Sequence, residues 1–244
     1  MKPTHKVALI LQLWQNFDRG IFQGISAYVR EKRSWSVFVE EVEHQRVPEF
    51  RSWDWDGLIV NFDNAHVARA IQGEDKPVIA VGGGGGWYQV ESGIPYVATD
   101  DNAIGRLAAE HLMDCGLTNF AYCGYPANRL NNWIGKRKQG FTDRLAAAGF
   151  GCEVFLGRRS NATHWSGVLQ DLSAWLLKLP LPVGIMGCYD YRARHVLEAC
   201  KAIGLRVPDD VAVIGVDNDI VCDLADPPLS SIEQGKYQIG YTAA

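Results

Sequence analysis

Carboxylates and amides stand at the ends of the predicted strands, where a parallel α/β sheet binds its ligands. Asp217 and Asn218 directly follow the apolar run Val211–Val216. Such a run is typical of a strand buried on both faces of a parallel sheet. In open α/β sheets, ligands bind in the crevice beyond the carboxyl ends of the strands. The pattern therefore predicts a ligand-binding carboxylate at Asp217, with a cap of the following turn as the structural alternative.

Further polar and aromatic residues follow other predicted strands or lie on the next helix. They are Asn16, Asp18, Arg19, Asp63, Trp133, Arg137, Tyr189 and Asp190. These groups suit a neutral polyol, because charged groups form strong hydrogen bonds to hydroxyls and an indole covers the C–H face of a sugar ring. The structural alternatives are a helix cap for Asp18, a turn for Asp63, core packing for Trp133 and a surface ion pair for Arg137.

The glycine run Gly82–Gly86 does not have the pattern of a nucleotide site. A dinucleotide fingerprint needs G-x-G-x-x-G at the start of a helix, whereas Trp87 or Tyr88 stands in place of the third glycine. No G-x-S-x-G elbow or Walker lysine occurs. The six cysteines and six histidines have neither metal-ligand nor disulfide-framework spacing. We expect no catalytic residues, no metal and no cofactor, and a mobile glycine loop beside a cleft.

Length and charge limit the class of protein. The 244 residues can form one large or two moderate domains, and the net charge of −4 gives no electrostatic footprint for nucleic acid. The apolar stretch Val7–Trp14 follows Lys2 and Lys6, but no A-x-A-like cleavage site comes after it. No run reaches the roughly 20 apolar residues that span a bilayer. These features predict a cytoplasmic protein with no membrane partner.

Hydrophobic periodicity predicts that strands and helices alternate along the chain. The expected strands are 7–13, 35–40, 57–63, 77–81, 96–98, 120–124, 153–156, 183–188 and 211–216. The expected helices are 18–31, 65–71, 103–115, 133–148, 166–178 and 192–203. This alternation predicts parallel sheets joined by right-handed crossovers.

The pattern restarts near Gly116–Asn119, and short fragments recur in the same order and in the same kinds of element. The recurring pairs are 23–25 with 139–141, 37–39 with 154–156, and 78–81 with 213–216. We therefore expect an α/β protein of two Rossmann-like parallel-sheet lobes. If the two lobes oppose their strand ends, the polar groups listed above line an interdomain ligand cleft.

Two groups of motifs carry a family resemblance. Residues 99–105, 110–116, 137–141, 213–217 and 228–234 resemble the sugar-sensing domain of lactose- and ribose-repressor-type regulators, which has the type I periplasmic-binding-protein fold. Residues 17–19, 61–63 and 189–195, and Trp133 four places before Arg137, are more similar to the xylose-operon activators. In those regulators an arabinose-activator-type DNA-binding region follows the sensor.

The resemblance implies a ligand-sensing domain of a transcription regulator that binds a small sugar, a pentose such as D-xylose. It implies sugar contacts at Arg137, Asp190 and Asp217, and a hinge or rim contact at Gln234. It also implies a homodimer, with DNA contacts only through a C-terminal region outside this chain. The first lobe would comprise residues 1–117 plus 236–244, and the second lobe residues 118–235.

Two other classes stay open on the sequence. A periplasmic sugar receptor for transport would have the same fold and would need an export signal. A Rossmann-type small-molecule enzyme would bind a nucleotide at Gly82–Gly86.

Overall fold

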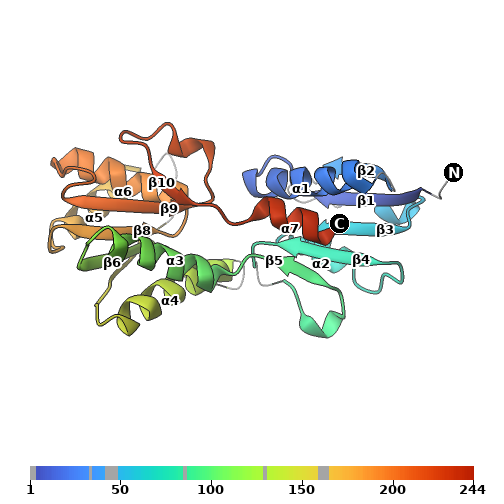
Figure 1. Cartoon of the computed structure of the whole chain (residues 1–244), viewed down its shortest axis with the longest axis horizontal. Coiled ribbons are helices and arrows are strands. Elements are labelled where there is room, and N and C mark those ends of the chain that lie inside the picture. Colours follow the sequence, from blue (N-terminus) through green and yellow to red (C-terminus); the bar gives the residue numbers. More distant parts are fainter. Residues whose placement is uncertain (1–3, 33–34, 42–48, 85–86, 129–130, 159–164) are drawn as a thin grey trace. The chain divides into compact units, whose positions relative to one another are not determined.

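The computed structural model forms two compact units, each with its own sheet (Figure 1). It describes residues 4–32, 35–41, 49–84, 87–128, 131–158 and 165–244. Unit 1 comprises Met1–Thr99, Arg129–Asn132 and Gly235–Ala244. Unit 2 comprises Asp100–Asn128 and Trp133–Gln234.

Unit 1 is built on a five-stranded parallel sheet in the order β2-β1-β3-β4-β5. Its strands are β1 (His5–Leu11), β2 (Trp35–Glu41), β3 (Gly57–Asn61), β4 (Val78–Gly82) and β5 (Tyr96–Ala98). Its α-helices are α1 (Asn16–Lys32), α2 (Ala65–Ala70) and α7 (Lys236–Ala243). Leu9 and Leu11 pack with residues of α1 and α7, whereas Ala8 and Ile10 pack with residues of α2. The apolar run in β1 is continuous because both faces of the sheet are covered.

Unit 2 has a second five-stranded parallel sheet, in the order β10-β9-β8-β6-β7. Its strands are β6 (Asn119–Gly124), β7 (Glu153–Leu156), β8 (Val183–Gly187), β9 (Val211–Val216) and β10 (Ser230–Ile232). Its α-helices are α3 (Asp101–Asp114), α4 (Asn132–Ala147), α5 (Trp165–Leu176) and α6 (Asp190–Ile203). All five residues of β8 are buried, as expected for the centre of such a sheet.

The two sheets repeat one topology. The orders β2-β1-β3-β4-β5 and β7-β6-β8-β9-β10 place successive strands in the same way. Each order reverses direction beside its first strand, between β1 and β3 and between β6 and β8, and ligands bind at such a switch point. The predicted fold of two parallel-sheet α/β lobes is confirmed, whereas the ligand cleft between lobes stays a prediction.

The structure places α3 in unit 2, although the predicted first lobe extended to residue 117. Ile104 and Leu112 of α3 share a core with Phe120 and Phe141. In the same way α7, which follows the last strand of unit 2, packs on α1 in unit 1 and places Ile239 in its core. Each unit therefore takes the helix that follows the fifth strand of the other. The predicted lobes already assigned residues 236–244 to the first lobe, whereas the strand–helix alternation has no interruption at residue 100 that would indicate the transfer of α3.

Glycines let α3 and α4 approach closely. A Cβ on Gly105 would lie 2.2 Å from the carbonyl oxygen of Arg137, and a Cβ on Gly140 would lie 2.1 Å from that of Asn102. Backbone atoms cannot rotate away as a flexible side chain can, so the helices would have to separate. We expect Gly105→Ala to lower the free energy of unfolding, measured in urea, by about 2–3 kcal/mol.

Gly167 in α5 is the matched control, because a Cβ there meets nothing within 4 Å. Gly167→Ala should leave stability unchanged or raise it by up to about 1 kcal/mol, since alanine favours helix. A similar loss of stability in both variants would contradict close packing as the cause.

Candidate functional site

The carboxyl ends of β1, β3 and β4 in unit 1 carry a connected set of polar groups, the unit 1 cluster. The Asp18 carboxylate is 0% exposed and accepts hydrogen bonds from the backbone N–H of Gln12 and from Asn61 Nδ2, the latter at 2.6 Å. Asn61 Oδ1 accepts from the backbone N–H of Asp63 at 2.6 Å. Asp63 Oδ2 accepts from the backbone N–H of Gly83 at 2.7 Å. The cluster therefore links three neighbouring strands at the switch point of the sheet.

Burial raises the pKa of Asp18 from its usual 3.8 to about 7. The negative charge of Asp63 adds to this shift, while the hydrogen bonds from Gln12 and Asn61 oppose it. Asp18 thus changes its protonation state near neutral pH.

The raised pKa of Asp18 predicts a pH-dependent stability. The folded state holds the Asp18 proton more tightly than the unfolded state, so stability should fall as pH rises from about 4 to about 7. The contribution should be on the order of a few kcal/mol. Urea unfolding at pH 5, 6, 7 and 8 should show this slope in the wild type and a weaker slope in Asp18→Asn. Asp75→Asn, at an exposed carboxyl of the same unit, is the control, and an unchanged slope in Asp18→Asn would contradict the assignment.

The other two predicted residues of unit 1 lie on the first turn of α1. Arg19 is exposed, and its Nη1 donates to the carbonyl oxygens of Leu13 at 3.2 Å and Trp14 at 2.9 Å. Its guanidinium thus holds the turn between β1 and α1. Asn16 is the first residue of α1 and is half-buried.

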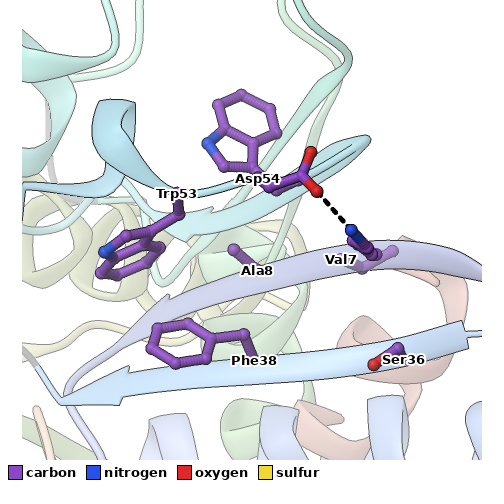
Figure 2. Close-up of a pocket in the computed structure, with 8 residues that line it drawn as sticks. Val7, Ala8, Ser36, Phe38, Trp53 and Asp54 are labelled. Atoms are coloured by element: carbon purple, nitrogen blue, oxygen red, sulfur yellow. Dashed lines mark hydrogen bonds and ion pairs between the residues drawn. The ribbon is translucent and has the colours of Figure 1, made fainter.

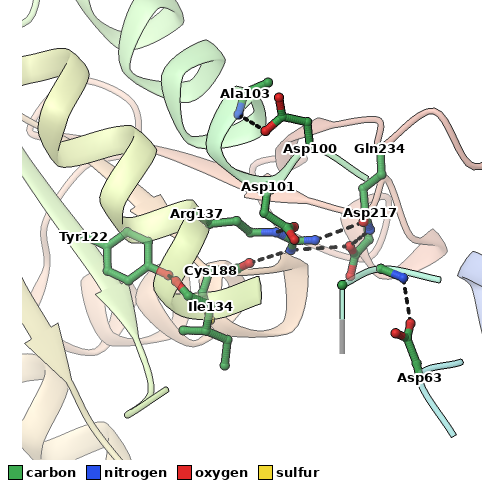
Figure 3. A network of polar contacts seen from close by, with 12 residues as sticks. Asp63, Asp100, Asp101, Ala103, Tyr122, Ile134, Arg137, Cys188, Asp217 and Gln234 are labelled. Carbon is green, nitrogen blue, oxygen red and sulfur yellow. Dashed lines mark hydrogen bonds and ion pairs between the residues drawn. The ribbon is translucent and has the colours of Figure 1, made fainter. Parts of the chain in front are cut away.

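A second connected set of residues, the unit 2 cluster, consists of Asp101, Trp133, Arg137, Asp217 and Gln234. Arg137 is at its centre (Figure 3). Its side chain is 4% exposed, and its three nitrogens have different partners. Nε donates to Asp101 Oδ1 at 2.9 Å, Nη1 to the carbonyl oxygen of Cys188 at 2.8 Å, and Nη2 to Gln234 Oε1 at 2.9 Å. Asp217 Oδ1 lies 3.8 Å from Nη1 and also accepts from Gln234 Nε2. Three predicted residues, Arg137, Asp217 and Gln234, are therefore in one network.

The backbone at the end of β9 holds the Asp217 carboxylate in an unusual position. Asp217 has φ 113° and Asn218 has φ 47°, and residues other than glycine rarely adopt a positive φ. Such conformations persist only where the surroundings fix them, and they concentrate at functional sites. The Asp217 side chain is 28% exposed, so its oxygens are accessible beside the buried guanidinium.

An aromatic wall adjoins Arg137. The Trp133 ring lies 4.5 Å from Arg137 Cζ, and Tyr189 meets Trp133 edge to face with ring centroids 6.0 Å apart. Tyr125 continues the row, 6.2 Å from Tyr189. Trp133 is partly buried against the core of unit 2, so it both packs and keeps exposed surface.

The described hydrogen bonds of Asp190 are to residues other than those of the unit 2 cluster. Its carboxylate is 0% exposed and accepts from the backbone N–H of Asp219 at 2.8 Å and from Ser231 Oγ at 2.6 Å. Burial raises the pKa of Asp190, and these two hydrogen bonds oppose the rise. Its described contacts tie the start of α6 to the segments after β9 and in β10. A direct contact with ligand stays a prediction for Asp190.

Three members of the two clusters were not among the predicted site residues: Gln12, Asn61 and Asp101. The sequence contains a signal for Asp101, because this residue lies three and seven positions before Ile104 and Ala108. That spacing places it on the buried face of α3. Asp100, its neighbour, caps α3 by accepting from the backbone N–H of Ala103 at 2.9 Å. Asn61 belongs to the motif at residues 61–63, but the sequence indicates no role for it or for Gln12, because their roles depend on which strands are neighbours.

A pocket of about 310 Å³ lies elsewhere in unit 1, near the start of β1 (Figure 2). Phe38, Trp53 and Val7 give it apolar walls. Lys6 and Asp54, which form an ion pair, also line it. It is at the amino end of β1, whereas ligands of such sheets bind at the carboxyl ends. The strand-end clusters therefore remain the candidate site. Of the glycine run, residues 85 and 86 lie outside the described part of the chain.

Within the described residues, no group of three or more His, Cys, Asp or Glu side chains is placed to hold a metal ion. All six cysteines are free thiols. No helix in the described ranges is both long and apolar enough to cross a membrane.

Comparisons with known proteins give consistent matches over both units. Residues 109–244 match the family model described as periplasmic binding protein-like domain, and residues 6–102 match the one described as XylR N-terminal domain. The xylose operon regulatory protein of Escherichia coli K12 is 32% identical over 244 residues, which cover 98% of this chain and 62% of that protein. Its namesake in Haemophilus influenzae is 33% identical over 242 residues, with the same coverage.

The solved structure of a xylose-binding transcription activator, XylR, matches with a TM-score of 0.83 and 30% identity. The match covers 100% of this chain and 62% of that one. The chain thus spans about 62% of the length of these relatives. The relatives named here are transcription regulators and not enzymes.

Proposed function

Because the chain belongs to the family of periplasmic binding protein-like domains, we propose that it is the sugar-sensing domain of a transcription regulator and that its effector is D-xylose. The observation that carries the proposal is similarity to xylose operon regulators over 98% of the chain. The unit 2 cluster supplies the chemistry, because it combines an accessible carboxylate, a buried guanidinium and an indole.

Each group of the unit 2 cluster suits one feature of a pentose. The Asp217 carboxylate would accept from sugar hydroxyls, and charge-assisted hydrogen bonds of this kind are roughly twice as strong as neutral ones. Arg137 keeps N–H groups beyond the three that its described bonds use, and these would donate to a sugar oxygen. The Trp133 ring would cover the C–H face of the sugar, with Tyr189 beside it.

The remaining predicted residues are proposed as ligand contacts or as supports of them. In unit 1, Asn16, Arg19 and Asp63 are the proposed contacts. Asp18 and Asp190 have protein donors on their carboxylates, so we propose that both act mainly by positioning neighbouring backbone.

Further partners follow from the class of protein. We propose a homodimer whose DNA contacts belong to a part of the regulator outside this chain. A regulator that binds DNA in a bacterium acts in the cytoplasm, which is the proposed location.

Thermal unfolding with a panel of sugars tests the proposal. D-xylose at about 100 times its dissociation constant should stabilise the folded state by about 2.7 kcal/mol, or roughly 5–11 °C in Tm. L-xylose is the matched control, since it has the same composition and the opposite handedness. D-ribose, L-arabinose and D-glucose complete the panel. A shift with another sugar alone would retire the xylose assignment, and no shift with any sugar would contradict sugar sensing.

A further inference from the structure

Arg137 contacts residues that lie next to three of the points where the chain passes between the units. Those points include Thr99–Asp100, Asn132–Trp133 and Gln234–Gly235. Asp101 is one residue beyond the first, Trp133 follows the second, and Gln234 precedes the third. We call Asp101, Trp133 and Gln234 the junction residues. They are far apart in the sequence, yet one guanidinium contacts all three.

The contacts give Arg137 a fixed position. Nη1 donates to the carbonyl oxygen of Cys188, directly after β8, which anchors the guanidinium to the sheet. Nε and Nη2 then hold Asp101 and Gln234, each at 2.9 Å. The Asp101 side chain is 0% exposed, so its bond to Arg137 is shielded from water and salt. A planar guanidinium suits this arrangement, because its donors point in fixed, divergent directions.

Asp217 connects this arrangement to the proposed sugar. Its Oδ1 accepts from Gln234 Nε2 and also faces Arg137 Nη1. A sugar hydroxyl that donates to Asp217 Oδ1 would therefore share this acceptor atom with Gln234 Nε2. Gln234 precedes Gly235, whose φ of 72° marks a turn of the backbone that glycine adopts easily.

We propose that Arg137 is a positioning residue that relays occupancy of Asp217 to the junction residues. A hydroxyl on Asp217 changes the bond of Gln234, and Arg137 passes this change to Asp101 because both share its guanidinium. The proposal rests on the proposed sugar-sensing function for its ligand, and on the described contacts for the relay itself. A residue that served only as a sugar contact would not need to hold two distant junction residues.

The test compares Asp101→Asn with Asp100→Asn in the 244-residue chain. Asp101→Asn keeps the shape and removes the charge that faces Arg137. Asp100→Asn removes the same charge one residue earlier, at an exposed helix cap where asparagine serves as well as aspartate. Hydrogen–deuterium exchange at the amides of residues 233–236 is the readout. Without sugar, Asp101→Asn should speed this exchange about threefold or more, because the buried Arg137 guanidinium then loses the ion pair that fixes its position.

D-xylose adds the second arm of the test. In the wild type, saturating D-xylose should change exchange at residues 99–102 and 233–236 together. In Asp101→Asn the change at residues 233–236 should fall at least about twofold, while the dissociation constant changes less than about tenfold. Asp100→Asn should respond as the wild type does.

The outcomes separate the relay from the sugar assignment. Equal exchange at residues 233–236 in wild type and Asp101→Asn would overturn the relay, and so would equal acceleration by both variants. If no sugar binds the wild type, the proposed function fails, and the sugar-free comparison still decides whether Arg137 links the junction residues.

Discussion

Asp217→Ala should weaken D-xylose binding by at least about 100-fold, because hydrogen bonds to a charged group contribute roughly 1.5–3 kcal/mol each and a carboxylate can accept two hydroxyls. Isothermal titration calorimetry on the 244-residue chain would measure the loss. Asp223→Ala is the matched control, since Asp223 is an exposed acid close by in the same loop. Wild-type affinity in Asp217→Ala would remove Asp217 from the site.

A second variant separates lost binding from lost folding. Alanine at a φ of 113° is strained, whereas glycine adopts this conformation readily. Asp217→Gly should therefore be at least as stable as Asp217→Ala and bind sugar equally poorly. If Asp217→Gly bound sugar like the wild type, the role of the carboxylate would be disproved.

Arg137→Met should lower the free energy of unfolding by about 3–5 kcal/mol, because it leaves the buried Asp101 carboxylate without its guanidinium partner. For a chain of this size, the loss corresponds to a fall in Tm of roughly 6–20 °C. Adding Asp101→Asn should recover part of the loss, since the buried charge is then gone. Urea unfolding of the two single variants and the double variant would measure the coupling.

Arg144→Met is the matched control for Arg137→Met. Arg144 pairs with Glu110 at 2.9 Å and joins the same two helices, α3 and α4, but the two side chains are 34% and 46% exposed. A partly exposed pair of this kind should contribute no more than about 1 kcal/mol. Equal losses in the two variants would show that burial of Asp101 does not set the cost.

The strands were predictable because the hydrophobic pattern of each one agrees with its burial in the folded protein. Continuous apolar runs such as Val211–Val216 have both faces buried, and the predicted position of each of the first nine strands corresponds to an observed strand. The family resemblance drawn from the motifs is confirmed by the match to the periplasmic binding protein-like domain. Two short elements were missed, β10 and α7, because three strand residues and a helix of weak amphipathicity carry little periodic signal.

The glycines that recur in the two halves of the sequence also have the same role in the two units. The fragments at residues 23–25 and 139–141 suggested a duplication, and both central glycines lie where two helices nearly touch. A Cβ on Gly24 would lie 2.0 Å from the carbonyl oxygen of Tyr237, as one on Gly140 would from that of Asn102 at 2.1 Å. Gly24 and Gly140 lie on α1 and α4, the helices that follow the first strands of the two sheets.

The sequence by itself determined the first nine strands, the duplication and which polar residues follow those strands, because hydrophobic period and position along the chain are local properties. Only the tertiary structure decided how those polar groups are used. It buried Asp18 and Asp190 among protein donors and left Asp217 accessible, and it paired Arg137 with Asp101. It also placed α3 in unit 2. These outcomes depend on which segments, distant in the sequence, come into contact. The free energy of burying a charge then depends on the hydrogen-bond and ion-pair partners that those segments supply.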